Sequence, residues 1–169
     1  MKLTSVLTTS LLLTCAALAA EAPKPSTEAS AAFDRIRQLA GKWQTSSKNG
    51  TGWLTYEVVS GGNAVLERET MANMPPMLTV YYLDGDRLLL THYCMAGNEP
   101  RMQARHFNAD TGDLKFEFLD ATNLTSPAAG HMHDVAMRLI DNDHFSSAWE
   151  FYENGKPKFT ETAEYTRVH

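Results

Sequence analysis

Polar and apolar residues alternate along most of the chain from Trp43 onward, and a repeat of two residues is typical of β-strands that bury one face. The alternating segments are Lys42–Ser46, Gly52–Val59, Ala64–Met71, Met77–Leu83, Arg87–Met95, Met102–Asn108, Leu114–Leu119, His131–Ile140, His144–Tyr152 and Lys158–Val168. Turn-forming stretches such as Ser60–Asn63 (SGGN) and Asp84–Asp86 (DGD) separate them and favour tight hairpins. We therefore expect an all-β fold, an antiparallel meander of about eight to ten strands, closed into a barrel that leaves no exposed edge.

One helical segment precedes the strands. Phe33 and Ile36 recur at helical spacing within residues 28–40, and Gly41 is a typical stop signal. The sequence shows no second helix of any length, no internal repeat and no domain linker. A short N-terminal helix and the barrel should therefore form one domain over residues 28–169.

The first residues, MKLTSVLTTSLLLTCAALAA, have the parts of a secretory signal peptide. Lys2 gives a positive start, residues 6–18 are mainly apolar, and Ala17-Leu18-Ala19 has the small-x-small pattern of a cleavage site. The apolar stretch is shorter than the roughly 20 residues that a membrane span needs, and no later segment is apolar enough to span a membrane. We expect a signal peptide over residues 1–19, a flexible leader over residues 20–27, and a secreted or periplasmic location.

The charge and the cysteine content of the chain limit which binding partners and which disulfides can be expected. The chain has 20 acidic and 15 basic residues, a formal net charge of −5, which gives no electrostatic case for binding nucleic acid. Beyond the predicted signal peptide only Cys94 remains, so no disulfide can form within the mature chain. The oligomeric state is left open by these patterns.

Two sets of sequence features resemble those of known proteins. A short helix followed by Gly41-Lys42-Trp43 at the first strand, with Arg167 on the last strand, resembles the lipocalin-like (calycin) barrels. That resemblance implies that Arg167 packs across Trp43. The stretches DGDRLLLTHYCMAGNEPRM, GHMH and WEFYENGK are also similar to uncharacterised secreted bacterial proteins, a likeness that brings no function with it. The chain lacks the disulfides that lipocalins usually have.

Strand alternation assigns several polar residues to the barrel interior. His92 and Cys94 share a face with Leu90, and His131 and His133 share the more apolar face of their strand. The polar residues predicted to face inward are His92, Cys94, His131, His133, Glu161 and Arg167. Residues 71–77, MANMPPM, form a Met- and Pro-rich connection that is a candidate lid over a barrel mouth.

The main functional hypothesis is non-catalytic binding of a small hydrophobic or amphipathic molecule, because barrels of this size enclose cavities with apolar walls and a few polar groups. The predicted walls are Tyr81, Phe116, Phe118, Met137 and Trp149, and the predicted polar contacts are His92, Arg101, His131 and His133. A third possibility is a structural envelope protein whose barrel is filled and holds no ligand.

The alternative hypothesis is a metal-binding protein or metal-dependent enzyme. His92, Cys94, His131 and His133 are side chains that zinc or copper prefers, and residues two apart on a strand lie on one face. An interior His or Cys is also compatible with a non-covalent haem. The sequence lacks a Gly-x-Ser-x-Gly elbow, a P-loop and a His-Glu-x-x-His motif, which favours a protein that is not an enzyme.

Overall fold

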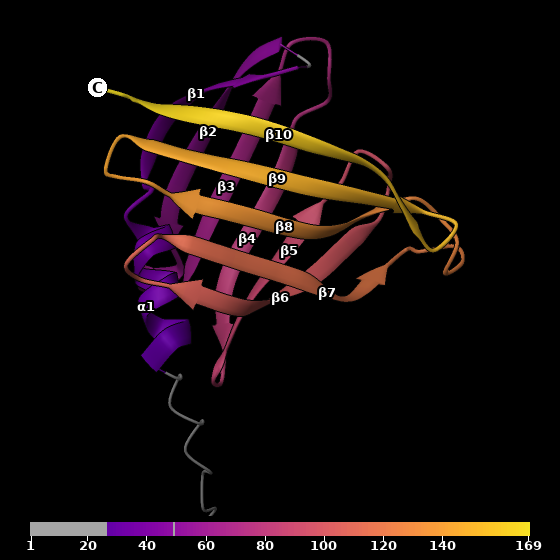
Figure 1. The fold of residues 1–169 in the computed structure, drawn as a ribbon, viewed down its shortest axis with the longest axis horizontal. Coiled ribbons are helices and arrows are strands. Elements are labelled where there is room, and N and C mark those ends of the chain that lie inside the picture. Colours follow the sequence, from indigo (N-terminus) through magenta and orange to yellow (C-terminus); the bar gives the residue numbers. More distant parts are fainter. Residues whose placement is uncertain (1–26, 49) are drawn as a thin grey trace, which may run out of the picture.

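Each strand pairs with its neighbours in chain order, and the first strand pairs with the last, so the sheet closes on itself. A computed structural model describes residues 27–48 and 50–169. Its elements are α1 Thr27–Arg37, β1 Gly41–Ser47, β2 Gly50–Val59, the 3-10 turn η1 Ser60–Gly62, β3 Ala64–Met71, β4 Met77–Asp84, β5 Arg87–Tyr93, β6 Glu99–Asn108, β7 Asp113–Thr122, β8 His131–Leu139, β9 His144–Glu153 and β10 Lys156–Val168. The predicted all-β fold, a ten-stranded antiparallel barrel with one short N-terminal helix, is confirmed (Figure 1).

The connection between β5 and β6 differs from the prediction. β5 ends at Tyr93 and β6 begins at Glu99, so Cys94 lies in the loop and not on the strand. Backbone hydrogen bonds fix this loop, with the Cys94 amide donating to the Asn98 carbonyl over 3.2 Å. Pro100 is tolerated within β6 because it lies beyond the part of β6 that pairs with β5.

The helix α1 lies against one end of the barrel, beside the ends of β6 and β8 (Figure 1). The Glu28 carboxylate accepts a 2.8 Å hydrogen bond from the Phe107 amide at the end of β6. Arg35 donates to the Leu139 carbonyl at the end of β8 over 3.2 Å. The buried side of α1, which includes Phe33 and Ile36, therefore closes this end.

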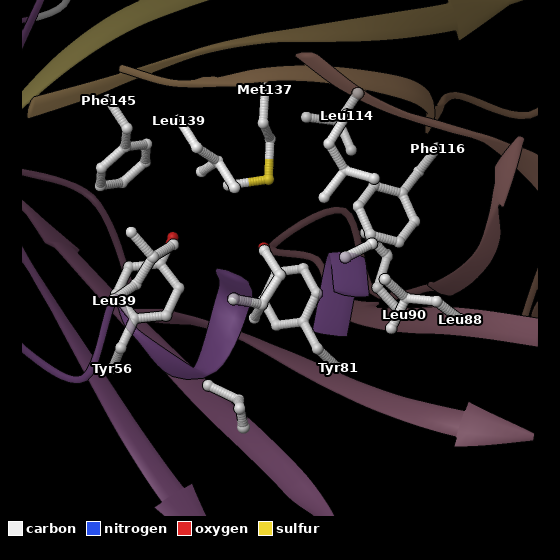
Figure 2. Packing of buried hydrophobic residues seen from close by; sticks show 14 of the residues in the cluster. Leu39, Tyr56, Tyr81, Leu88, Leu90, Leu114, Phe116, Met137, Leu139 and Phe145 are labelled. Atoms are coloured by element: carbon white, nitrogen blue, oxygen red, sulfur yellow. The ribbon is translucent and has the colours of Figure 1, made fainter. Parts of the chain in front are cut away.

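Aromatic and aliphatic side chains fill the half of the interior that lies next to α1 (Figure 2). Phe145 stacks on Tyr165 with ring centroids 4.1 Å apart, and meets Trp43 edge to face at 4.8 Å. Tyr81 contacts both Tyr56 and Phe116 at centroid distances of 6.4 and 5.9 Å. This half of the barrel is thus a packed core that leaves little room for a ligand.

Arg167 joins three segments at the closed end. Its guanidinium lies 4.2 Å over the Trp43 ring, the contact that the resemblance to lipocalin-like barrels implies. It donates hydrogen bonds to the carbonyls of Gln38, Ala40 and Asn142, at 2.9, 2.8 and 2.6 Å. A Cβ atom at Gly41 would lie 3.0 Å from Arg167 Nη1, at a φ of +129° that disfavours side chains, so glycine suits this position. Arg167 therefore lies at the barrel end and ties β10 to the α1–β1 connection.

The predicted signal peptide, residues 1–19, lies outside the described residues, as does the predicted leader except for its last residue. That residue, Thr27, is the first of α1. Among the described residues, no helix is long and apolar enough to cross a membrane.

We predict that Arg167→Ala lowers the free energy of unfolding by about 1–3 kcal/mol, because it removes the cation–π contact and the donors for three backbone carbonyls. Urea unfolding followed by circular dichroism measures this loss. Arg68→Ala, at an exposed position of β3, is the matched control and should change stability by less than about 0.5 kcal/mol. Equal effects of the two substitutions would contradict the role given to Arg167.

Candidate functional site

A cavity of about 210 Å³ lies inside the barrel at the end away from α1. Strand direction fixes this placement: α1 contacts the ends of β6 and β8, whereas the cavity lining comes from the start of β8 and from the loop that precedes β6. We call it the mouth cavity. It is lined by Thr45, Ser47, Glu67, Glu69, Met71, Met74, Met77, His92, Cys94, Met95, Ala96, Met132, Trp149, Phe151, Phe159, Glu161, Ala163 and Tyr165.

Methionine and aromatic side chains make up most of the apolar wall. Met71 ends β3, Met74 lies in the connection, Met77 begins β4, and all three line the cavity. On the other side, Phe151 and Phe159 stack in parallel with centroids 4.9 Å apart. Flexible thioethers adapt to ligands of different shapes. This wall therefore suits apolar molecules of several shapes better than a single substrate of fixed shape.

A buried hydrogen-bonded chain connects the packed core to two residues of the cavity lining, Glu67 and His92. Tyr81 donates its hydroxyl to Glu67 over 2.7 Å, and Thr79 donates to the other Glu67 oxygen over 3.4 Å. The Thr79 oxygen also lies 3.0 Å from His92 Nδ1. Burial raises the pKa of the Glu67 carboxyl, while the hydrogen bonds that it accepts oppose this increase.

His92 is a neutral imidazole in this setting. Burial lowers its pKa to about 4, and its ring packs against Trp149 with centroids 4.9 Å apart. The Thr79 hydroxyl has one proton, so the tautomer in which it donates to Glu67 has His92 Nδ1–H donating to Thr79 and Nε2 as an acceptor. In the part of the chain that the structure describes, this buried Nε2 atom has no hydrogen-bond partner.

Two further carboxyl groups line the cavity. Burial raises the pKa of Glu69 to about 7, and the negative charges of Glu67 and Glu161 add to the increase. Glu161 forms a 3.5 Å ion pair with Lys48. Three carboxyl groups therefore line the mouth cavity, and no lysine or arginine is among the described residues that line it.

Only part of the predicted site reaches this cavity. His92, Cys94 and Trp149 line it, as does Glu161, which was predicted to face inward. Tyr81, Phe116 and Met137 face inward but lie in the packed core. Arg101 forms an ion pair with Asp120, with Nε 2.6 Å from Oδ1, and does not line the cavity.

The prediction that His131 and His133 face the same interior as His92 is wrong. They pack instead with Phe118 and Tyr152, outside the cavity lining: His133 lies between Phe118 at 4.7 Å and Tyr152 at 3.9 Å. His131 Nε2 is 3.1 Å from His133 Nδ1.

A β-bulge explains this error. The pairing of β8 with β9 shifts between Met132 and Asp134, so strict alternation fails at this point. Met132 lies opposite the cavity-lining Phe151 and lines the cavity itself, whereas His131 lies opposite Tyr152. Counting by two along the strand gives the opposite result, because it cannot include the extra residue.

The four predicted metal ligands are therefore not brought together. His92 and Cys94 line the cavity, while His131 and His133 lie in the cluster with Phe118. Within residues 27–48 and 50–169, no group of three or more His, Cys, Asp or Glu side chains is placed to hold a metal ion. A volume of about 210 Å³ is below the roughly 300–1,000 Å³ of pockets for drug-sized ligands, so a haem does not fit.

Glu67 and Glu69 are site residues that the sequence analysis missed. A signal for them exists in the sequence: Val65, Glu67, Glu69 and Met71 alternate along one strand and share one face. An apolar residue at each end of the series indicates an inward face that contains two carboxyls. Carboxyls are rarely buried without a partner, which argues against such a face being interior when the sequence is taken alone.

Comparisons with known proteins support the fold alone. No family model matches the sequence, and no curated protein matches it. The chain is similar in structure to a protein of unknown function from the DUF3598 family of Nostoc punctiforme PCC 73102, with a TM-score of 0.50 and 14% identity. The match covers 90% of this chain and 53% of the other, so the chain spans about half the length of that protein. A structure of EF1p2_mFAP2b bound to DFHBI has 10% identity over 80% of this chain and 98% of that one, and its TM-score is 0.29.

We predict that Glu69→Gln stabilises the protein above pH 7, by up to about 3 kcal/mol, because it removes a carboxylate that must otherwise ionise in a buried site. The folded-state pKa of Glu69, about 7, is above its ordinary value of 4.5, so the wild-type protein loses stability as the pH rises through 7. The advantage of the variant should therefore vanish below pH 4.5. Urea unfolding of both proteins from pH 4 to 8 measures it, and a difference that does not depend on pH would contradict the assignment.

Proposed function

We propose that this protein is a lipocalin-like barrel that binds a compact, largely apolar small molecule in its mouth cavity, without catalysing a reaction. The observation that carries the proposal is the division of the interior. The half next to α1 is packed with side chains, whereas the other half leaves about 210 Å³ between methionine and aromatic walls. A cavity with apolar walls and a few placed polar groups is typical of a small-molecule site.

The state of the nearby nucleophile supports a binding role over a catalytic one. Burial raises the pKa of the Cys94 thiol, and the charge of Glu69 raises it further. A thiol with a raised pKa stays protonated near neutral pH, and the thiolate is the reactive form. His92 is neutral, and its Nδ1 atom lies 3.0 Å from the Thr79 hydroxyl, so the pair lacks the features of an activated nucleophile.

We also propose that the protein acts in the periplasm or outside the cell. The support is the signal pattern over residues 1–19. Expression of the full chain in a bacterial host, followed by fractionation and mass measurement, tests this. We expect a periplasmic protein that lacks the first 19 or 20 residues, and an intact cytoplasmic protein would contradict the proposal.

The binding proposal predicts that Ala163→Leu weakens small-molecule binding at least tenfold, because the added side chain enters the mouth cavity. The control is Ala148→Leu, the same change on the neighbouring strand β9, at a position that does not line the cavity. Native mass spectrometry of purified protein and calorimetric titration with short-chain alcohols measure binding. Equal affinities of the two variants, or no binding by the wild-type protein, would contradict the proposal and favour a structural envelope protein.

A further inference from the structure

Carboxyl groups are prominent among the polar groups that line the mouth cavity. Glu67, Glu69 and Glu161 supply carboxyl oxygens, and the buried His92 Nε2 atom has no hydrogen-bond partner among the described residues. In the tautomer whose Nε2 is an acceptor, this atom lacks a donor in the empty barrel, and a donor on a ligand would relieve the cost of leaving it unpaired. An apolar ligand without a donor would leave it unsatisfied.

Two of these carboxyl groups, Glu67 and Glu69, form no ion pair with a basic side chain of the described residues. Lys48 lies 3.5 Å from the third, Glu161. A bound anion would meet these carboxyls with no basic side chain of the described lining to pair with. A bound cation would instead meet carboxyl oxygens from two different strands, β3 and β10.

Aromatic rings line the opposite wall. Trp149, Phe151 and Phe159 lie around the cavity, and the face of an aromatic ring attracts a cation within about 6 Å of its centre. Lys48 shows this preference at the cavity edge, because its ammonium lies 5.8 Å from the Phe159 ring centre. The wall thus accepts both an apolar body and a positively charged group.

We propose that the ligand of the mouth cavity is a compact apolar molecule that carries a protonated primary amine. Its ammonium group pairs with Glu69 and donates to His92 Nε2, while its apolar body packs on the methionine and aromatic walls. Fatty acids and other apolar carboxylates are excluded. This inference rests on the proposed function, because it specifies the chemistry of a molecule bound at that site.

Proton linkage follows from the surroundings of Glu69. The titratable or charged groups that face it are Glu67 on the same strand, Glu161 and Tyr165 on β10, Cys94 in the β5–β6 loop, and Lys48 beside Glu161. An ammonium in the cavity favours the ionised carboxylate, so binding releases a proton from Glu69 near neutral pH. The affinity for an amine should therefore rise as the pH rises through 7, whereas that for a neutral alcohol should not.

The experiment is calorimetric titration of the mature full-length protein with two matched series. One series is hexylamine, hexan-1-ol and hexanoate, and the other is 2-phenylethylamine, 2-phenylethanol and phenylacetate. We expect each amine to bind about tenfold more tightly than its alcohol, since a hydrogen bond to a charged group adds roughly that factor, and the carboxylates to bind most weakly. An alcohol or carboxylate that binds as tightly as its amine overturns the inference and leaves the proposed function standing.

Variants separate the role of Glu69 from a general effect of charge. Glu69→Gln should weaken amine binding about tenfold more than it weakens alcohol binding, and it should abolish the rise in amine affinity with pH. Glu57→Gln removes the same charge from an exposed position of β2 and should change neither. Equal losses in both variants, or an unchanged pH profile in Glu69→Gln, overturn the inference. Failure of every probe to bind overturns the proposed function together with it.

Discussion

The width of a closed ten-stranded barrel is the constraint on which the rest of this structure depends. Eight strands enclose an interior that side chains alone just fill, and additional strands enlarge it. Here the largest inward-facing side chains, including Trp43, Tyr81, Phe116 and Phe145, are concentrated in the half next to α1. The other half receives flexible methionines, two loops and several carboxyls, so its interior is only partly filled.

The two ends of the barrel differ because large side chains fill one half of its interior and leave the other half partly open. At the closed end, Arg167 covers Trp43 and bonds to carbonyls from two connections, which supports the seam between β1 and β10. At the other end, no helix formed by residues 27–48 or 50–169 covers the strands, and Met71, Met74 and Met77, from the end of β3 to the start of β4, line the cavity. The contacts that close the barrel and the cavity of the proposed binding site therefore lie at opposite ends of the same sheet.

Buried carboxyls give the mouth its chemical character. Glu67 is held by Tyr81 and Thr79, and the Thr79 oxygen also lies 3.0 Å from His92 Nδ1, so an interior polar chain links the carboxyl to the imidazole. Glu69 lacks comparable support and has a pKa of about 7 in its buried position. A group that gains or loses a proton near neutral pH makes the energetics of this cavity sensitive both to pH and to the charge of any molecule inside it.

The sequence alone determined the strands, the turns, the helix and the closed meander, because these depend on local alternation and turn chemistry. It also placed His92, Trp149 and Glu161 on the inner face, since no irregularity interrupts alternation between them and the core residues of their strands. Only the tertiary structure decided which inward-facing residues fill the core and which line a cavity, because that depends on where α1 packs. It also decided the positions of His131 and His133, since a bulge that arises from pairing with β9 reverses the faces of β8.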